Sequence, residues 1–210
     1  MAKFDLKWKI APVRTPRRCV VKFVDKYLKK GWRVLDFGCG EGRHLEYMVN
    51  KGIDAIGIDH SEEGVKKTNA RFNGEEKAFV GDITAPFLRT IGFDAIVCNR
   101  VIEYHSSEVI GEIFVSMNAI LNDGGYAFLA TRSNKQKPKD YENLVLENQY
   151  GGLDYDTGSG TIQHYFSREE IIALCKASGF DIISMKMREV EAAAKYEWQI
   201  VLRKRHEDLH

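Results

Sequence analysis

The chain has little net charge and lacks any long hydrophobic run. Its 31 Lys and Arg residues nearly balance 30 Asp and Glu residues, which leaves a formal net charge of +1 over 210 residues. Such a balance gives no general attraction to nucleic acids or anionic membranes, so we expect neither as a partner. No apolar stretch reaches transmembrane length. The N-terminal segment is charged and contains Pro12 and Pro16, so we also expect no signal peptide.

Cysteine and histidine are few and scattered. The four cysteines, at positions 19, 39, 98 and 175, include no CxxC pair, which is typical of reduced cysteines in a cytoplasmic protein. The six histidines show no spacing typical of metal ligands, and the sequence predicts no metal site. The sequence contains no internal repeat, and its length suits a single domain over residues 1–210.

The most informative segment is 34–44, where a short apolar strand runs into Asp36 and then into three alternating glycines, Gly38, Gly40 and Gly42. A helical pattern follows at once. Glycines at this spacing allow a sharp turn with positive φ angles, and they leave no side chain between the loop and whatever lies against it. A strand, a glycine loop and a helix N-terminus together predict a nucleotide-type site.

The spacing also indicates which kind of nucleotide binds. The dinucleotide fingerprint would place its third glycine one position later, where this chain has Arg43. A phosphate-binding P-loop would end in Gly-Lys-Ser/Thr, which is absent here. Glu41 at the start of the helix would repel a pyrophosphate. We therefore expect a ligand that is poor in phosphate, and a nicotinamide-dependent oxidoreductase is the less favoured alternative.

Two further acids end apolar runs. The run 53–58 is followed by Asp59, whose carboxylate can accept hydrogen bonds from the two hydroxyls of a ribose. Ser61 is the expected N-cap of the next helix. Asp82 comes just after a third short strand, expected near 77–80, and a turn-forming role is the alternative for this residue.

These residues together resemble the class I S-adenosylmethionine-dependent methyltransferases, from about Pro16 to Leu202. The resemblance implies an α/β fold: a Rossmann-like three-layer sandwich around a seven-stranded, mostly parallel sheet with an antiparallel last strand. It implies methyl transfer from S-adenosylmethionine, with S-adenosylhomocysteine as product. The cofactor-binding residues that we expect are Asp36, Gly38, Cys39, Gly40, Arg43, Asp59, His60, Asp82, Ile83 and Asn99.

The resemblance gives several of these residues a role. It places Asp36 near the methionine amino group and the backbone carbonyl of Asn99 within reach of the same group. Asp82 would accept from the adenine amine, with Ile83 packed on or near the ring. His60 either stacks beside the adenosine or is exposed. Arg43 either pairs with the cofactor carboxylate or forms a salt bridge on the first helix.

Strands and helices alternate along the chain, which predicts a parallel sheet covered on both faces. Strands are expected near 33–37, 53–58, 77–80, 93–98 and 126–131, followed by a terminal pair at 180–187 and 197–203. Helices are expected near 16–30, 42–51, 62–72, 107–121 and 168–178. The last of these helices begins with the sequence of a capping box, Ser167 to Glu170.

Two segments break the alternation. Residues 1–15 form an N-terminal arm, and residues 132–163 form an insertion rich in polar residues and glycine. A long irregular segment within a compact domain is usually functional. We interpret 132–163 as a lid on the substrate side with a short element near 141–148.

Candidates for chemistry lie after the fourth strand and at the end of the insertion. Because histidine ordinarily titrates near neutral pH, His105 and His164 are candidate general bases. Arg100, Tyr104 and Tyr165 are expected on the substrate side. The alternative is that these side chains line or support the pocket without moving a proton.

We expect a small-molecule acceptor, because the chain carries no appended nucleic-acid module and aromatic residues gather near the presumed site. One alternative is a protein or RNA target docked on the basic run 132–139. Another is a non-catalytic protein that binds S-adenosylmethionine. The sequence leaves open whether the protein is a monomer or a homodimer.

Overall fold

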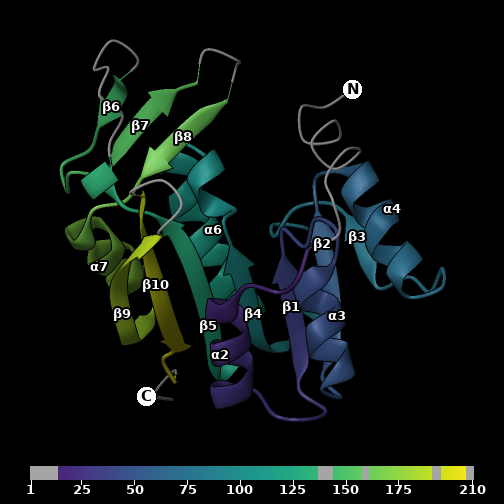
Figure 1. Cartoon of the computed structure of the whole chain (residues 1–210). Helices are drawn as coiled ribbons and strands as arrows, with labels where there is room; N and C mark the ends of the chain where they lie inside the picture. The colour runs from purple at the N-terminus through teal and green to yellow at the C-terminus, as the bar shows by residue number, and fades with distance from the viewer. Residues whose placement is uncertain (1–13, 137–143, 158–160, 191–194, 207–210) are drawn as a thin grey trace.

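The computed structural model describes residues 14–136, 144–157, 161–190 and 195–206 (Figure 1). A seven-stranded sheet forms the centre, in the order β3-β2-β1-β4-β5-β10-β9. Strand β10 runs antiparallel to both β5 and β9, whereas the other strands point one way. The predicted fold class is confirmed. The strands are β1 (Arg33–Phe37), β2 (Asp54–Asp59), β3 (Ala78–Val80), β4 (Phe93–Asn99), β5 (Leu121–Arg132), β9 (Phe180–Val190) and β10 (Lys195–Lys204).

Helices cover both faces of this sheet (Figure 1). One apolar cluster joins the sheet to α2 and α3, and a second joins its opposite face to α5, α6 and α7. Helix α4 packs on β2 and β3. The bounds are α2 (Arg18–Tyr27), α3 (Arg43–Asn50), α4 (Glu62–Arg71), α5 (Leu88–Ile91), α6 (Ser107–Ile120) and α7 (Arg168–Ala177), with short 3₁₀ turns η1 (Ile102–Tyr104) and η2 (Asn134–Gln136).

The central strand β4 shows why the sequence forms three layers. Ala95 and Val97 belong to the cluster with α2 and α3, while Ile96 and Cys98 belong to the cluster with α6 and α7. A parallel strand that is buried on both faces has a continuous apolar run, and this one is apolar from Ala95 to Cys98. The carboxyl ends of β1, β2 and β4 therefore meet at one edge of a rigid sheet.

The insertion contains a small antiparallel sheet (Figure 1). Its strands are β6 (Leu144–Glu147), β7 (Leu153–Asp156) and β8 (Ile162–Tyr165). Strand β6 falls where the sequence predicted a short element, but β7 and β8 were not predicted. Residues 137–143 and 158–160 of the insertion lie outside the described residues. Its role as a lid stays a prediction.

A buried charged cluster fixes this small sheet to two helices. Asp154 and His164 are cross-strand partners, and Nδ1 of His164 lies 2.5 Å from the Asp154 carboxylate. Nε2 of His164 lies 2.9 Å from the carboxylate of Glu170 on α7. The amide of Ser107 at the start of α6 donates to Asp154 at 3.1 Å. The sheet is thus held by charge-assisted hydrogen bonds in a dry environment.

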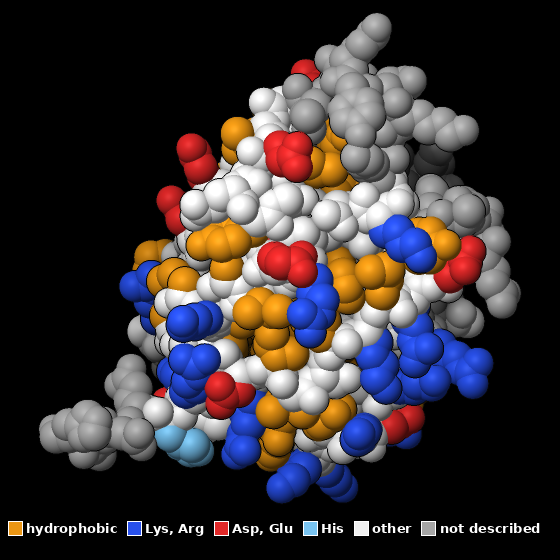
Figure 2. Space-filling view, turned by 90° about the vertical axis from the view of Figure 1, so that its left-hand side faces the viewer, with side chains coloured by type: hydrophobic (Ala, Val, Ile, Leu, Met, Phe, Trp, Pro, Cys, Tyr) orange, Lys and Arg blue, Asp and Glu red, His pale blue; other side chains and the backbone are white. Residues whose placement is uncertain are grey.

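Strand β9 forms one edge of the central sheet. The face that carries β9 and α7 exposes Ile172, Ile183 and Met187. Figure 2 shows that the hydrophobic patches on this side are separated by Lys, Arg, Asp and Glu side chains. Among the described helices, none has the length and apolar character needed to cross a bilayer.

Candidate functional site

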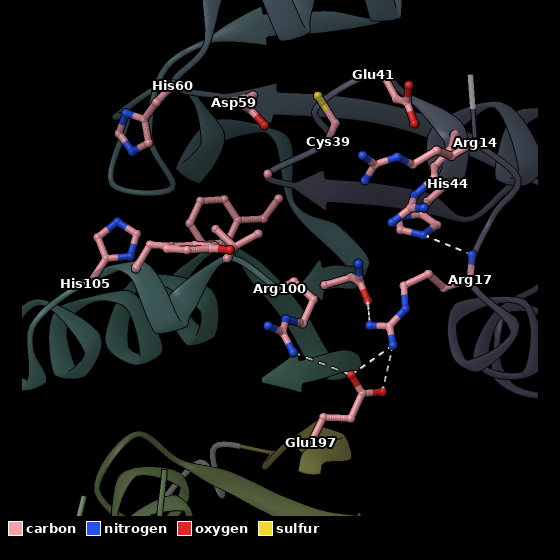
Figure 3. A pocket seen from close by; sticks show the side chains of 16 residues that line it. Arg14, Arg17, Cys39, Glu41, His44, Asp59, His60, Arg100, His105 and Glu197 are labelled. Atoms are coloured by element: carbon pink, nitrogen blue, oxygen red, sulfur yellow. Dashed lines mark hydrogen bonds and ion pairs between the residues drawn. The ribbon is translucent and has the colours of Figure 1, made fainter. Parts of the chain in front are cut away.

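A cavity of about 350 Å³ opens at the carboxyl ends of β1, β2 and β4 (Figure 3). In an open α/β sheet this is where ligands bind, since the loops that leave the strands diverge there. The side chains come from both ends of the sequence and from its centre. The lining residues are Arg14, Arg17, Phe37, Gly38, Cys39, Glu41, Arg43, His44, Asp59, His60, Asn99, Arg100, Val101, Tyr104, His105 and Glu197.

The glycine loop adopts the backbone that the sequence predicted. Gly38, Gly40 and Gly42 have φ angles of 73°, 56° and 79°. A Cβ at Gly38 would overlap the side chain of Val101, and one at Gly42 would lie 2.8 Å from Cγ2 of Thr68. Two of these glycines are thus required by close packing against the protein itself. Only Gly38 of the three lines the cavity.

Asp59 is held at the tip of β2 by two backbone amides. Gly40 N donates to Oδ2 at 2.8 Å, and Ser61 N donates to Oδ1 at 2.9 Å. Ser61 itself caps α4 by accepting from Gly64 N at 3.0 Å, as predicted. A carboxylate has about four acceptor positions, so both oxygens of Asp59 can still accept from a ligand.

Asp36 is buried next to the cavity rather than in its lining. Its side chain is 1% exposed, and no group within the described residues hydrogen-bonds its Oδ2 atom. Burial and the nearby charge of Asp59 raise the pKa of Asp36 to about 7, whereas Arg43 opposes this rise. An unpaired buried carboxyl oxygen is costly and marks a position where a donor is missing.

His60, Asp82 and His105 come together at one end of the cavity. His60 Nε2 lies 3.0 Å from Oδ2 of Asp82. This contact raises the pKa of His60 and lowers that of Asp82. Burial, aided by the charge of His60, lowers the pKa of His105. Figure 3 shows the two imidazoles near one another at the cavity mouth. Ile83 is buried and does not line the cavity.

The opposite end is closed by an ionic contact that the sequence did not predict. Both oxygens of Glu197 accept from Arg17 Nη2 at 2.9 Å, and Arg17 Nη1 donates to Asn99 Oδ1 at 3.0 Å. Arg100 Nη1 lies 3.8 Å from Glu197. Arg17 and Glu197 are 180 residues apart, and no local pattern pairs them. Asn99 was expected to act through its backbone carbonyl, and its side chain is engaged here as well.

Arg100 has an unusual backbone. Its φ angle is +64°, which non-glycine residues seldom adopt. Its Nε lies 2.5 Å from Oε1 of Glu103, which is fully buried, and Thr131 Oγ1 donates to the other oxygen of Glu103 at 3.1 Å. Burial raises the pKa of Glu103, and Arg100 opposes that rise. Strained residues held in this way cluster at functional sites.

Other lining residues were also missed. His44 Nε2 accepts from the amide of Arg17 at 3.3 Å, and burial and Arg43 lower the pKa of His44 to about 3. Glu41 is 3% exposed. Both residues lie at the start of α3, next to the glycine motif. Their position beside that motif was the sequence signal that could have identified them as lining residues. Arg14 had no such signal.

The two predicted site residues on β8 lie outside the cavity lining. His164 is 0% exposed and does not line the cavity. Its two nitrogens contact Asp154 and Glu170, so it cannot take a proton from a molecule in this cavity. The expectation of a general base at His164 is therefore corrected to a structural role. Tyr165 is buried against Leu153 and Tyr155, outside the lining. Arg100, Tyr104 and His105 do line it.

Comparison with known proteins gives a consistent result. A family model described as a methyltransferase domain matches residues 13–185. A ubiquinone biosynthesis O-methyltransferase of Agrobacterium fabrum is 33% identical over 159 residues, which are 73% of this chain and 61% of that relative. The chain thus spans about three fifths of that protein's length.

Solved structures share the fold. An S-adenosylmethionine-dependent methyltransferase from Methanosarcina mazei superposes with a TM-score of 0.74 at 19% identity, covering 92% of this chain and 100% of that one. A 1,6-didemethyltoxoflavin-N1-methyltransferase from Burkholderia thailandensis, solved with its substrate and S-adenosylhomocysteine, gives 0.68 at 16% identity, over 90% and 78% of the two chains.

Proposed function

Since the chain belongs to the class I S-adenosylmethionine-dependent methyltransferases, we propose that it methylates a small-molecule acceptor bound in the cavity described above. The cofactor supplies a methyl group that its sulfonium has already activated. The chain's own contribution is to hold the two reactants in the geometry of an in-line displacement and to exclude water from them.

The proposal rests on the arrangement of Asp36 and Arg43 beside the cavity. One buried carboxylate oxygen of Asp36 has no hydrogen-bond partner among the described residues, and Arg43 lines the cavity and acts on the same carboxylate. An amino acid presents an ammonium and a carboxylate on one carbon. Asp36 would accept from the first, and the Arg43 guanidinium would donate to the second.

We assign the adenosine part of the cofactor to the end of the cavity where His60 and Asp82 lie. Asp59, already oriented by two amides, would accept from the ribose hydroxyls. Asp82 and Ile83 would contact the adenine from beyond the cavity lining, with His60 beside it. Gly38, Cys39, Gly40 and Asn99 would complete the contacts along the loop ends.

The acceptor is assigned to the walls made by Arg100, Tyr104 and His105. Burial lowers the pKa of His105, which favours the neutral imidazole that can take a proton from a hydroxyl acceptor. Because the Agrobacterium relative is named an O-methyltransferase, we propose an oxygen nucleophile as the first class to test. A cytoplasmic location belongs to the same proposal.

A protein or RNA target docked on 132–139 is not favoured. Arg132 turns inward, 3.8 Å from the buried Glu103 and over the ring of Tyr165. Lys135 lies over the ring of Tyr196. Two of the basic side chains of this run are thus used within the molecule. Residues 137–139 lie outside the described residues.

Calorimetric titration with S-adenosylhomocysteine tests the cofactor assignment. The wild-type protein is expected to bind it. Asp59→Ala should weaken binding by about tenfold or more, since it removes an acceptor to two hydroxyls. Asp59→Asn separates this effect from loss of the loop contacts, and exposed Asp181→Ala is the matched control. Absence of binding to wild type, or equal affinity of Asp59→Ala, would reject the assignment.

A second measurement separates an enzyme from a binding protein. S-adenosylhomocysteine formation is followed with phenols, thiols, amines and carboxylates as acceptors. Turnover with a phenol or another hydroxyl compound is expected. Cofactor binding without turnover across the panel would favour the non-catalytic alternative.

A further inference from the structure

Within the described residues, His60, Asp82 and His105 are the one group whose ligand atoms lie close enough together to share a metal ion. Each offers a ligand atom, and these three atoms lie within 4.8 Å of one another. The residues come from three separate places: the end of β2, the turn after β3 and the end of η1. Their separation along the chain is why no spacing in the sequence predicted the group.

The donor set suits a divalent transition-metal ion. Two imidazoles and one carboxylate are borderline ligands that Zn²⁺ accepts at about 2.0–2.2 Å, with a fourth position left for water. Ligands at such distances are roughly 3.4 Å apart in a tetrahedral site. The 3.0 Å between His60 Nε2 and Asp82 Oδ2 is already near this spacing, so a bound ion requires mainly that the His105 ligand atom move closer to this pair.

The surroundings favour a cation. The negative charge of Asp82 raises the pKa of both histidines, and that of Asp59 also raises the pKa of His60. Thr84 N donates to the other oxygen of Asp82 at 2.9 Å, which orients that carboxylate. The Nδ1 atom of His105 is buried and has no hydrogen-bond partner in the described part of the chain. The His60 side chain is 57% exposed, so an ion can enter from solvent.

We propose that His60, Asp82 and His105 bind one divalent transition-metal ion, such as Zn²⁺, at the mouth of the cavity. The site itself does not depend on the proposed function. The consequence of metal binding does depend on the proposed function. Because Asp82 is also the proposed adenine contact, the ion and the cofactor exclude one another. Occupancy of the metal site would then inhibit cofactor binding.

Titration with Co²⁺ tests the site directly. The full chain is treated with a chelator, freed of it and titrated with Co²⁺ while visible absorption is recorded. Saturation at one ion per chain with the strong absorption of a tetrahedral site is expected. His60→Ala and His105→Ala should each weaken binding by about tenfold or more. Exposed His206→Ala is the control and should bind like wild type.

The two proposals fail in different ways. Absence of saturable absorption, or equal Co²⁺ affinity in folded His105→Ala, would overturn the metal site while leaving S-adenosylhomocysteine binding in chelator intact. Saturating S-adenosylhomocysteine is expected to release the bound Co²⁺. Simultaneous binding of both would overturn the exclusion through Asp82.

Discussion

Asp36 is a carboxyl group that its surroundings keep protonated close to neutral pH. Its pKa is raised from 3.8 to about 7, chiefly by burial. Between these two values the native state holds a proton that the unfolded chain releases, so this group makes the native state less stable as pH rises from about 4 to about 7. A cation bound against the carboxylate would favour its charged form and so lower the pKa of Asp36.

Cofactor binding should therefore depend on the charge of Asp36. The affinity for S-adenosylhomocysteine is expected to rise as pH increases through about 7 and then level off, as measured by calorimetry. Asp36→Asn should abolish this rise and weaken binding at about pH 8. The same variant should stabilise the free protein there by about 1–3 kcal/mol in urea denaturation. An unchanged pH profile in Asp36→Asn would contradict this reasoning.

The glycine loop offers a second test at single residues. Gly42 and Gly74 both have positive φ, but a Cβ at Gly42 meets Thr68 whereas one at Gly74 meets open space. Gly74→Ala should cost about 1 kcal/mol from backbone strain alone. Gly42→Ala should cost more and also weaken S-adenosylhomocysteine binding, because the loop must move. Equal losses of stability in urea denaturation would show that the packing against Thr68 is unimportant.

At the scale of elements, the small sheet of the insertion depends on His164. Burial alone would lower the pKa of this imidazole, but hydrogen bonds with Asp154 and Glu170 raise it to about 9. Its stabilising contribution is therefore complete below about pH 6.5 and is lost as pH rises through about 9. His164 thus acts as a buried cation that joins β8 to α7.

Replacing His164 should release that junction. His164→Ala leaves Asp154 and Glu170 buried without their shared partner, at a cost of about 3 kcal/mol at pH 6. Thermal unfolding followed over pH should show wild-type stability declining towards pH 9 and a flatter profile in the variant. His206→Ala, at an exposed position, is the control. A variant as stable as wild type at pH 6 would refute the structural role.

Among the central strands, β4 was predicted well, whereas β5 begins at Leu121, before the expected start at 126. Strand β4 is buried on both faces, so its pattern was unambiguous and its limits were predicted within one residue. Strands β7 and β8 have only four residues each and lie among Gly, Asp and Ser, so nothing local marks them. Of the two hydrogen bonds that the predicted capping box at Ser167 implies, the structure contains one. Ser167 accepts from Glu170 N, but the Glu170 side chain contacts His164 instead of the helix start.

Across the whole molecule, the cavity was predictable on one side only. The glycine motif, Asp59 and Asn99 lie near strand ends that the alternation of elements had already located. Glu197 lies in a strand whose neighbours in sequence give no hint of a site, and its partner Arg17 is 180 residues away. Contacts of this kind depend on sheet order, which brings β10 beside β5.

The ion pair between Arg17 and Glu197 should matter for stability. The Glu197 side chain is 2% exposed, so Arg17→Met leaves a buried charge with weaker partners and should cost about 3 kcal/mol in urea denaturation. The double variant Arg17→Met with Glu197→Leu should recover much of this loss. Exposed Arg18→Met is the control. If the double variant is less stable than Arg17→Met, the loss is not due to an unpaired charge.

The position of β10 between β5 and β9 has a consequence for synthesis on the ribosome. Strand β9 emerges first and has no neighbour to pair with until β10 inserts between it and the rest of the sheet. Glu197 reaches Arg17 only at that step. A nascent polypeptide that stalls before β10 would carry the glycine loop and Asp59 but an unfinished wall, so competence to bind the nucleoside should arise late in translation.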